Sequence, residues 1–397
     1  MVIYLDNNAT TRVDPDVLDA MLPYLSDFYG NPSSMHSFGG QVGAAVQAAR
    51  VQVANLLGAE DTEIIFNSCG SEGNNTAIHA ALAAQPEKRH IVTTAVEHPA
   101  ILNVCKHLEK RGYTVTYLSV DSRGQLDLME VEAAMTGGTA LVTTMYANNE
   151  TGVIFPIEQI GAIAKEYEAT FHVDAVQAVG KVPIDLKNST IDLLTLSGHK
   201  LHAPKGVGAL YVRRGFRFRP FLLGGHQERG RRAGTHNVPG IIALGKAAEQ
   251  AREHLVNVQK EQQLRDSLET QLLTLIPDCQ VNGGGTTRLP NTTNIGFKYI
   301  EGEAILFMLN QHGICASSGA ACTSGSLDPS HVLTAMGLPY TILHGSIRFS
   351  LSRFTTEEDI QQVVNVMPGI VEKLRAISPF NSDEAGWLQD RDLVHSA

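Results

Sequence analysis

Short apolar runs rich in β-branched residues alternate with helical segments between Glu63 and Arg213. Seven of these runs predict strands: "EIIFNS", "HIVTT", "TVTYLSV", "ALVTTM", "TFHVD", "DLLTLS" and "VGALYVR". Strands that alternate with helices are typical of an α/β fold, in which helices cover both faces of a mostly parallel sheet. Ligands of such sheets bind outside the carboxyl ends of the strands. The residues that end each run are therefore the first candidates for chemistry.

A second region follows a long helical pattern. Residues 241–275 carry charges at helical spacing and no proline, which predicts a helical connector. Beyond it, the runs "TTNIGF" and "GSIRFSLS" and the helix-like stretch "EEDIQQVVNVMPGIVEKLRAI" predict a smaller α+β unit. A chain of 397 residues exceeds the size at which one core usually stops growing. We therefore expect one large domain and a smaller companion.

Composition and charge narrow the classes of function. The chain is 43% hydrophobic and 18% charged, as ordinary globular proteins are. Its formal net charge of -10 disfavours nucleic acid as a partner. It has no apolar run long enough to span a membrane and no signal pattern, which predicts a cytoplasmic protein with no membrane partner. The five cysteines form no CxxC pair, so they predict free thiols and no metal site.

Polar residues at four strand ends predict a site for a carbonyl cofactor. The stretch "FNSCGSEGNN" can open a helix whose free N–H groups suit a phosphate. Three further ends carry His98, Asp174 with Gln177, and Lys200. Pyridoxal 5'-phosphate needs an amine, an acidic partner for its ring nitrogen and an anion cradle, and this set supplies all three. In the crevice, desolvation would favour the neutral, nucleophilic form of Lys200.

Each of these residues also has a structural interpretation. Taken alone, Lys200 is a surface lysine, Asp174 a helix N-cap, Gln177 a solvent-facing amide and His98 a structural histidine. The stretch "GHKLHAPKG" lacks the G-x-x-x-x-G-K-[ST] order of nucleotide-binding loops, which excludes that function. The shared location at strand ends favours the cofactor site.

Cys322 is the candidate nucleophile among the cysteines. It lies in "SSGAACTSGSLDPSH", a run of small and polar residues that predicts an exposed loop. Free cysteines are usually small buried hydrophobes, but an exposed thiol on a loop packs poorly and is a good soft nucleophile.

Several stretches occur together in one order along the chain: "YLDNNATT", "YGNPSSMH", "VEHPA", "ANNETG", "HVDAVQAVGK", "SGHKLHAPKG", "GRRAGTHN", "SSGAACTSGSLDPSHV" and "IRFSLSRF". Together they resemble the cysteine desulfurases, fold type I pyridoxal-phosphate enzymes of the class V aminotransferase group. The resemblance extends to about Pro379, and "HQERGRRAGT" is most similar to the nitrogen-fixation (NifS) branch. Cys69, Gly70 and Ser71 replace the family's "GAT" turn, and serine keeps the hydroxyl.

The resemblance implies a role for each candidate residue. Lys200 would bear the cofactor, Asp174 would pair with its ring nitrogen and Gln177 would contact its phenolic oxygen, with His98 over the ring. The implied phosphate contacts are Gly70, Ser71, Ser197 and His199, together with Thr235 from the second subunit of a homodimer. The implied substrate contacts are Arg348, which would bind the carboxylate, and Asn149. The implied catalytic residues are Cys322, Lys200 and His98.

The implied activity converts L-cysteine to L-alanine and holds the sulfur on Cys322 as a persulfide. An iron-sulfur scaffold protein would accept that sulfur, for nitrogenase maturation. The implied architecture is a large cofactor-binding domain at 15–258, with a mostly parallel seven-stranded sheet, and a small domain formed by 1–14 and 259–379. Residues 380–397 would be a polar tail. An aminotransferase of the same fold group, a selenocysteine lyase and a non-catalytic sulfur carrier are the alternatives.

Overall fold

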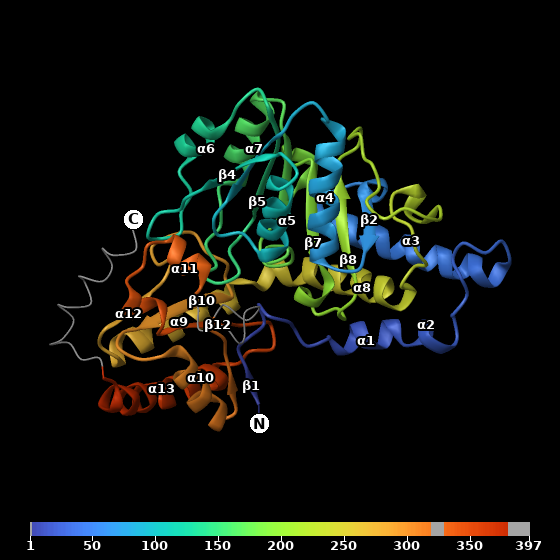
Figure 1. Cartoon of the computed structure of the whole chain (residues 1–397). Coiled ribbons are helices and arrows are strands. Elements are labelled where there is room, and N and C mark those ends of the chain that lie inside the picture. The colour runs from blue at the N-terminus through green and yellow to red at the C-terminus, as the bar shows by residue number, and fades with distance from the viewer. Residues whose placement is uncertain (1, 319–328, 380–397) are drawn as a thin grey trace.

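One large sheet organises the molecule. Within residues 2–318 and 329–379, which the computed structural model describes, seven strands form a sheet in the order β2-β8-β7-β6-β5-β3-β4 (Figure 1). They are β2 (Ile64–Asn67), β3 (His90–Thr94), β4 (Thr114–Leu118), β5 (Thr139–Met145), β6 (Thr170–Asp174), β7 (Leu193–Ser197) and β8 (Gly208–Val212). Strand β8 runs antiparallel to both of its neighbours, and the other pairs are parallel. The predicted strands and the mostly parallel sheet are confirmed.

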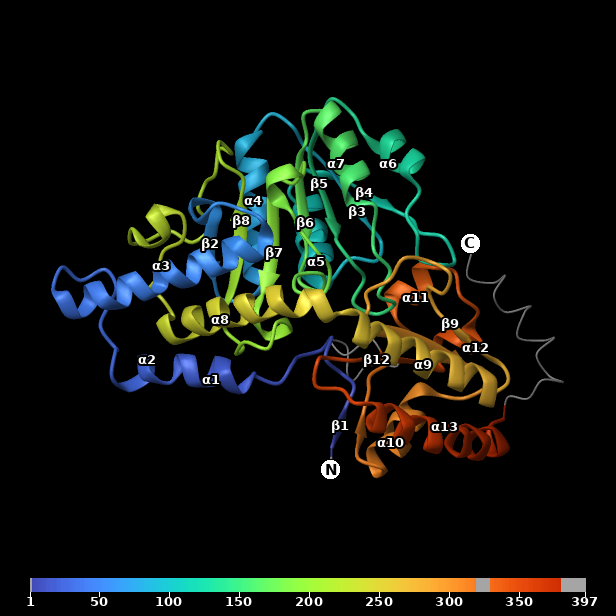
Figure 2. The ribbon, with the colours of Figure 1, turned by 180° about the vertical axis from the view of Figure 1, so that it is seen from behind.

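Helices cover both faces of this sheet (Figures 1 and 2). Because side chains alternate along a strand, Ile64 and Phe66 of β2 join one core and Ile65 joins the other. The first core contains α3 (Ser37–Leu57), α6 (Leu128–Ala134), α7 (Ile157–Glu166) and α8 (Val238–His254). The second contains α4 (Gly70–Ala84) and α5 (Pro99–Glu109). Burial on both faces explains why the strands are nearly continuous apolar runs.

A smaller α+β unit lies beside the large sheet. In the described part of the chain, β9 (Cys279–Val281), β10 (Thr292–Phe297) and β12 (Ser346–Ser350) form an antiparallel sheet, and β1 (Ile3–Tyr4) pairs with β11 (Ile314–Cys315). Its core contains α9 (Gln259–Leu275), α10 (Gly302–Gln311) and α13 (Glu357–Ile377), and Ile3 and Leu5 of the N-terminus join that core. The predicted smaller unit is confirmed, whereas the boundaries at 14/15 and 258/259 stay predictions.

The remaining described elements are short. The helices are α1 (Pro15–Met21), α2 (Pro23–Ser26), α11 (His331–Ala335) and α12 (Tyr340–Leu343). The 3-10 helices are η1 (Asp61–Glu63), η2 (Leu186–Asn188), η3 (Gly198–Lys200), η4 (Gln227–Gly230) and η5 (Leu255–Asn257). Over all the residues that the structure describes, no helix is both long enough and apolar enough to span a membrane.

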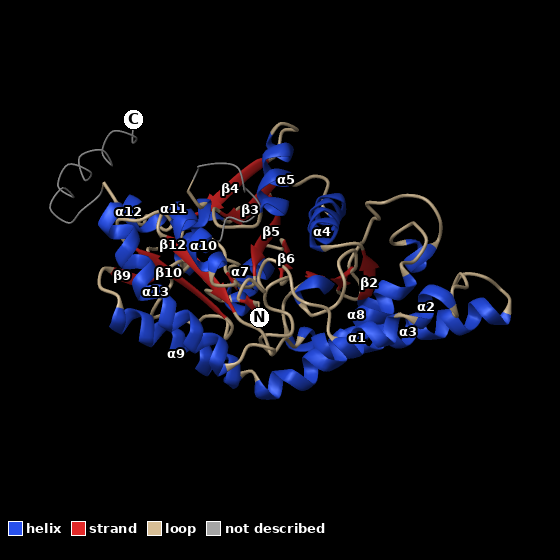
Figure 3. Cartoon of the chain, turned by 90° about the horizontal axis from the view of Figure 1, so that it is seen from below, coloured by secondary structure: helices blue, strands red, loops and turns tan. Residues whose placement is uncertain are grey.

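The helical connector predicted at residues 241–275 is not one continuous helix. It consists of α8 and α9, which are separated by η5 and Val258 (Figure 3). Valine and asparagine are weak helix formers, and Val256 and Asn257 lie at this break. The two helices also belong to different cores, since α8 packs in the core of the large sheet and α9 in that of the smaller unit. Helical spacing in the sequence carries no information about such a change of packing partner.

Helices α3 and α8 pack at unusually short range at Gly245. A Cβ atom on Gly245 would lie 2.6 Å from both Cα and Cβ of Ala49 on α3. Gly369 of α13 is also a mid-helix glycine, but it is exposed, and a Cβ atom there would meet no described atom within 4 Å. An alanine at Gly245 therefore tests the effect of close packing, and an alanine at Gly369 tests that of helix propensity alone.

We therefore expect opposite effects from the same substitution. Gly245→Ala should lower the free energy of unfolding by about 1–3 kcal/mol, because overpacking outweighs the gain in helix propensity. Gly369→Ala should raise it by up to about 1 kcal/mol. Urea and thermal unfolding of the two variants measure both changes. Equal shifts of the same sign would show that α3 and α8 move apart at little cost.

Candidate active site

A cavity of about 390 Å³ opens at the carboxyl ends of the parallel strands. Its walls come from the ends of β5, β6 and β7, from the first turns of α4 and α5, from the N-terminal segment and from β12. Most predicted site residues line it: Gly70, Ser71, His98, Asn149, Asp174, Gln177, Ser197, His199, Lys200 and Arg348. Thr235 does not line it, and Cys322 lies outside the described residues. The roles of all these residues stay predictions.

Lys200 follows β7 at the end of the 3-10 helix η3. Its ammonium donates hydrogen bonds to the backbone carbonyl oxygens of Asn8 and Ala9, the latter at 2.7 Å. These acceptors belong to a segment 191 and 192 positions away in the chain. The N-terminal segment therefore holds the amine of Lys200 in place.

Asp174 ends β6 with its side chain buried. Its Oδ2 accepts a hydrogen bond from Asn74 Nδ2 at 2.6 Å, and its Oδ1 accepts one from the Val176 backbone N–H at 3.0 Å. The bond to Val176 shapes the turn after the strand, but no described helix begins there, so Asp174 is not the helix N-cap that was its alternative interpretation. Both oxygens accept hydrogen bonds, as a carboxylate does, so the cavity presents a held negative charge.

The first turn of α4 and Ser197 face one corner of the cavity. Cys69, the N-cap residue of α4, makes no capping bond with its side chain, and the first N–H groups of a helix have no intrahelical partner. A Cβ atom on Gly70 would lie 3.7 Å from Ser197 Cβ and 2.9 Å from Val176. The Ser197 hydroxyl is buried and has no hydrogen-bond partner among the described residues. Helix N–H groups and an unsatisfied hydroxyl together suit an anion.

His98 is the N-cap of α5 and presents a neutral ring to the cavity. Its Nδ1 accepts the Ala100 backbone N–H at 3.1 Å, so the neutral ring carries its proton on Nε2. Burial lowers the pKa of His98, the positive charge of Lys200 adds to this, and Asp174 opposes it. Burial also lowers the pKa of His199, with help from neighbouring lysines, to about 4. Both rings are neutral at physiological pH.

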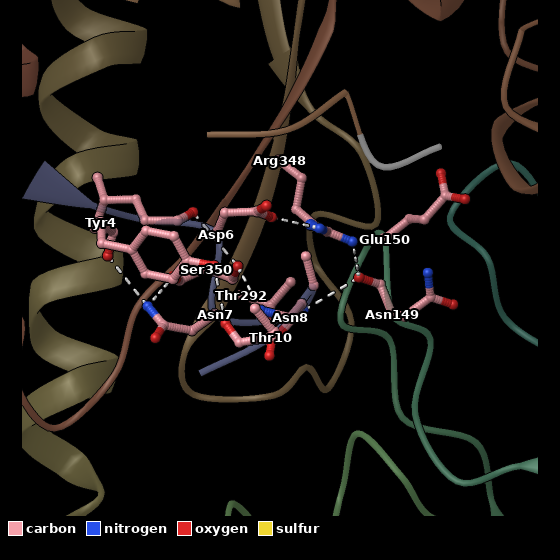
Figure 4. Close-up of polar contacts among 12 residues, drawn as sticks. Tyr4, Asp6, Asn7, Asn8, Thr10, Asn149, Glu150, Thr292, Arg348 and Ser350 are labelled. Atoms are coloured by element: carbon pink, nitrogen blue, oxygen red, sulfur yellow. Dashed lines mark hydrogen bonds and ion pairs between the residues drawn. The ribbon is translucent and has the colours of Figure 1, made fainter. Parts of the chain in front are cut away.

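Arg348 brings a guanidinium from β12 to the wall of the cavity, and Figure 4 shows its contacts with Asp6 and Asn149. Its side chain is 2% exposed. Nη2 forms an ion pair with Asp6 Oδ1 at 2.7 Å, and Nη1 donates to the Asn149 carbonyl at 3.0 Å. Asn8 Nδ2 donates to the same carbonyl at 3.1 Å. The backbone of Asn149 thus orients the guanidinium.

Thr235 is exposed and lies in the segment 228–236. The buried ion pair between Glu228 and Arg50 anchors this segment. Glu228 accepts hydrogen bonds from Arg50 Nη1 and Nη2 at 2.7 and 2.8 Å and from His236 Nε2 at 2.8 Å. Arg232 of the same segment pairs with Glu72 of α4 at 2.8 Å. Burial alone would raise the pKa of Glu228, but the bonds from His236 and Arg50 lower it to about 2. These contacts hold residues 228–236 in place, and Thr235 is exposed and does not line the cavity of its own chain.

Sequence reasoning missed four polar residues of this site: Asp6, Asn8, Asn74 and Lys181. Asp6 and Asn8 lie in the stretch "YLDNNATT" and Asn74 in "FNSCGSEGNN". The stretches as a whole therefore indicated a site, but not these residues within it. Asparagine and aspartate are common in turns, and nothing local marks these as site residues. Their contacts with Arg348, Lys200 and Asp174 are visible only in three dimensions.

Comparison with known proteins shows the family of the chain. The family model for class V aminotransferases matches residues 3–363. The chain is 76% identical over 396 residues to cysteine desulfurase 2 of Trichormus variabilis, which covers 99% of this chain and 100% of that protein. It is 59% identical over 380 residues to the cysteine desulfurase NifS of Azotobacter vinelandii, which covers 95% of this chain and 94% of that protein. A solved structure of a NifS-like protein matches with a TM-score of 0.88 at 39% identity, covering 94% of this chain and 100% of that one.

The chain therefore belongs to the class V aminotransferase family, and within it to the cysteine desulfurases. Its mostly parallel sheet and covering helices are the fold type I architecture of the NifS-like structure. The resemblance read from the sequence is confirmed at the level of family and fold.

The Glu228 ion pair predicts a stability effect with a defined pH range. The folded-state pKa of Glu228 lies below its ordinary value of 4.5, so its stabilisation is fully present above 4.5 and is lost as the pH falls towards about 2. Glu228→Gln should lower the free energy of unfolding at neutral pH by about 3–5 kcal/mol, because Arg50 is left buried without a counter-charge. The difference from wild type should shrink at acid pH.

Urea unfolding between neutral pH and about pH 3 measures this effect. Glu249→Gln is the matched control, because Glu249 pairs with Lys246 at 2.7 Å on the surface with both side chains partly exposed. That variant should change the free energy of unfolding by less than about 1 kcal/mol at any pH. Equal effects of the two substitutions would contradict a stabilising role of the buried pair.

Proposed function

We propose that this chain is a pyridoxal-phosphate-dependent enzyme that converts L-cysteine to L-alanine and holds the sulfur on Cys322 as a persulfide. One observation carries the proposal: an amine, a buried carboxylate and a buried guanidinium, from Lys200, Asp174 and Arg348, line a single cavity. Membership of the cysteine desulfurases supports the same activity.

The polar groups of the cavity fit pyridoxal 5'-phosphate. The unsatisfied Ser197 hydroxyl beside the N-terminus of α4 suits the phosphate, with Gly70, Ser71 and His199 around it. The Asp174 carboxylate suits the ring nitrogen, Gln177 the phenolic oxygen, and His98 the face of the ring. Lys200 supplies the amine that bears the cofactor. When bound, the cofactor supplies an electron sink for electrons released at the substrate carbon atoms.

Arg348 would bind the substrate carboxylate. A guanidinium fork matches a carboxylate in geometry and charge. Its Nε is buried and has no hydrogen-bond partner within the described part of the chain, so the group is not saturated by its contacts to Asp6 and Asn149. The Asn149 side chain, which also lines the cavity, is the second candidate for this anion. Binding the carboxylate here orients the substrate amine towards Lys200.

Lys200 and His98 would move protons. Lys200, once its amine is free, takes the proton from the substrate Cα. His98 is neutral and carries its proton on Nε2, so its Nε2–H can donate a hydrogen bond in the cavity, and the ring passes a proton on only after it has taken up a second one.

Cys322 would take the sulfur. As a thiolate it attacks the substrate sulfur, so an S–S bond forms and the substrate C–S bond breaks. The electron pair of that bond passes to the substrate Cβ, which takes a proton, and the proton that Lys200 removed returns to Cα to complete alanine. The described residues on either side support this assignment. Ser317 pairs through its backbone with Arg348 at 2.6 and 3.2 Å, and Ser330 Oγ donates to Glu150, next to Asn149, at 2.5 Å.

The proposal includes a homodimer in the cytoplasm. Thr235 is exposed and does not line the cavity of its own chain, which supports its predicted place in the phosphate site of a second subunit. An iron-sulfur scaffold protein would accept the sulfur for nitrogenase maturation. The support for this acceptor is the similarity to a relative that bears the name NifS.

Replacement of Cys322 tests the sulfur step. Cys322→Ala should lower alanine and sulfide formation from L-cysteine by about a hundredfold or more, while the visible absorption of the bound cofactor stays. Lys200→Ala should lose both the activity and that absorption. Cys279→Ala is the matched control, because the Cys279 thiol is half-buried in the small sheet and donates to the Ile276 carbonyl at 3.0 Å. The assay measures alanine and sulfide with a reductant in excess.

Three outcomes would contradict parts of this proposal. Normal sulfide release by Cys322→Ala would exclude this thiol as the acceptor. Amine transfer to a 2-oxo acid without sulfide release would indicate an aminotransferase, and a strong preference for selenocysteine a selenocysteine lyase. A protein that never binds the cofactor would be a sulfur carrier.

A further inference from the structure

Lys181 ends the stretch "HVDAVQAVGK", but neither the predicted site roles nor the proposed mechanism uses it. It follows the turn after β6 and lies four positions beyond Gln177. Its Nζ donates to Gln177 Oε1 at 2.9 Å and to Asn8 Oδ1 at 3.2 Å. Lys181 therefore reaches the cavity through two residues that line it, Gln177 and Asn8.

These contacts determine the orientation of the side-chain amides of Gln177 and Asn8. An ammonium group can only donate hydrogen bonds, so each amide must turn its oxygen towards Lys181. The Nε2 of Gln177 is then directed away from Lys181 and donates to the Asn8 carbonyl at 2.9 Å. In this orientation Gln177 presents N–H groups, and not its carbonyl oxygen, to the cavity side.

The direction of the Gln177 amide matters for its predicted partner. A phenolic oxygen that carries negative charge needs a donor, and an amide turned by 180° would place its own oxygen there instead. Gln177 has no other described contact to Oε1 that would hold this orientation. The choice between the two amide orientations therefore rests on Lys181 at Oε1 together with the Asn8 carbonyl, which accepts from Nε2.

Asn8 is less dependent on Lys181. Its Oδ1 also accepts from Asn291 Nδ2 at 3.3 Å, and its Nδ2 donates to the Thr292 hydroxyl at 2.9 Å. These bonds would hold the Asn8 amide after the loss of Lys181. The Asn149 carbonyl and the guanidinium of Arg348 should then keep their places, so the substrate side of the cavity should change little.

The charges around Lys181 define the conditions of a test. Burial lowers the pKa of Lys181 to about 7, the positive charges of Lys200 and Arg348 add to this, and Glu261 opposes it. At about pH 6 the group is therefore mainly an ammonium. Because burial already disfavours that charge, an apolar replacement of similar length should leave the fold intact.

We propose that Lys181 is a positioning residue, which holds the Gln177 amide with its N–H groups towards the phenolic oxygen of the cofactor. This inference rests on the cofactor site of the proposed function. It assigns Lys181 no contact with the substrate or the cofactor.

The test uses the full-length protein loaded with pyridoxal 5'-phosphate at about pH 6. In Lys181→Met the visible absorption band should shift, and the dissociation constant of the cofactor should rise about tenfold, as expected for the loss of one hydrogen bond to a charged group. The Michaelis constant for L-cysteine should change less than twofold. Lys181→Arg, which keeps the donors, should restore the band position at least in part.

Lys187→Met is the matched control. Lys187 is exposed on η2, six positions further along the same segment, and the variant should bind the cofactor as wild type does. Circular dichroism of each apoprotein shows whether it has folded. If Lys181→Met does not fold, Lys181→Arg and Lys181→Gln provide the same comparison of spectra and affinities.

A double-mutant cycle separates positioning from a direct effect of charge. If Lys181 acts through Gln177, then Lys181→Met should cause no further loss of cofactor affinity in a Gln177→Ala background. Additive losses would overturn the proposal, and so would an unchanged band and affinity in Lys181→Met. A wild-type protein that binds no pyridoxal 5'-phosphate would instead overturn the proposed function, so the two failures are distinguishable.

Discussion

The N-terminal segment from Leu5 to Thr11 is the constraint on which the cavity depends. On one side it pairs with β12, where the Ser350 N–H donates to the Leu5 carbonyl at 2.8 Å and the Asn7 N–H to the Ser350 carbonyl at 3.2 Å. On the other side, its Ala9 carbonyl accepts a hydrogen bond from the ammonium of Lys200 at 2.7 Å, and its Thr11 N–H donates to the His199 carbonyl at 3.0 Å. A few residues therefore hold the amine of the large sheet and the guanidinium of the small sheet in one cavity.

Buried charges make this arrangement specific. Arg348 pairs with Asp6, which lies 342 positions away in the chain. Asp174 accepts a hydrogen bond from Asn74, which lies 100 positions away. A buried charge without a partner costs several kcal/mol, so each group is stable only where the fold supplies its partner. The contacts that satisfy these charges therefore also fix their positions in the cavity.

The segment that carries Thr235 contains two residues with a strained, left-handed backbone. Glu228 and Arg229 have left-handed backbones with φ of 50° and 60°, which side chains other than glycine rarely adopt. Such conformations cost about 1–3 kcal/mol each and persist only where surrounding contacts hold them. The two-point bond between Arg50 and Glu228 supplies such contacts. It ties this surface segment to α3, the Phe66 N–H ties it to β2, and Thr235 stays exposed.

The sequence alone determined the strands, the mostly parallel sheet and the convergence of His98, Asp174 and Lys200. Apolar runs record burial on two faces, and the carboxyl ends of parallel strands meet at one edge, so both follow from local pattern and general geometry. Only the tertiary structure decided the break between α8 and α9, because it depends on which core each helix joins. The tertiary structure also decided which residues Asp6, Asn8, Asn74 and Lys181 contact. Short polar residues look alike in a sequence, and their contacts here are defined by partners that the chain brings close only when it folds.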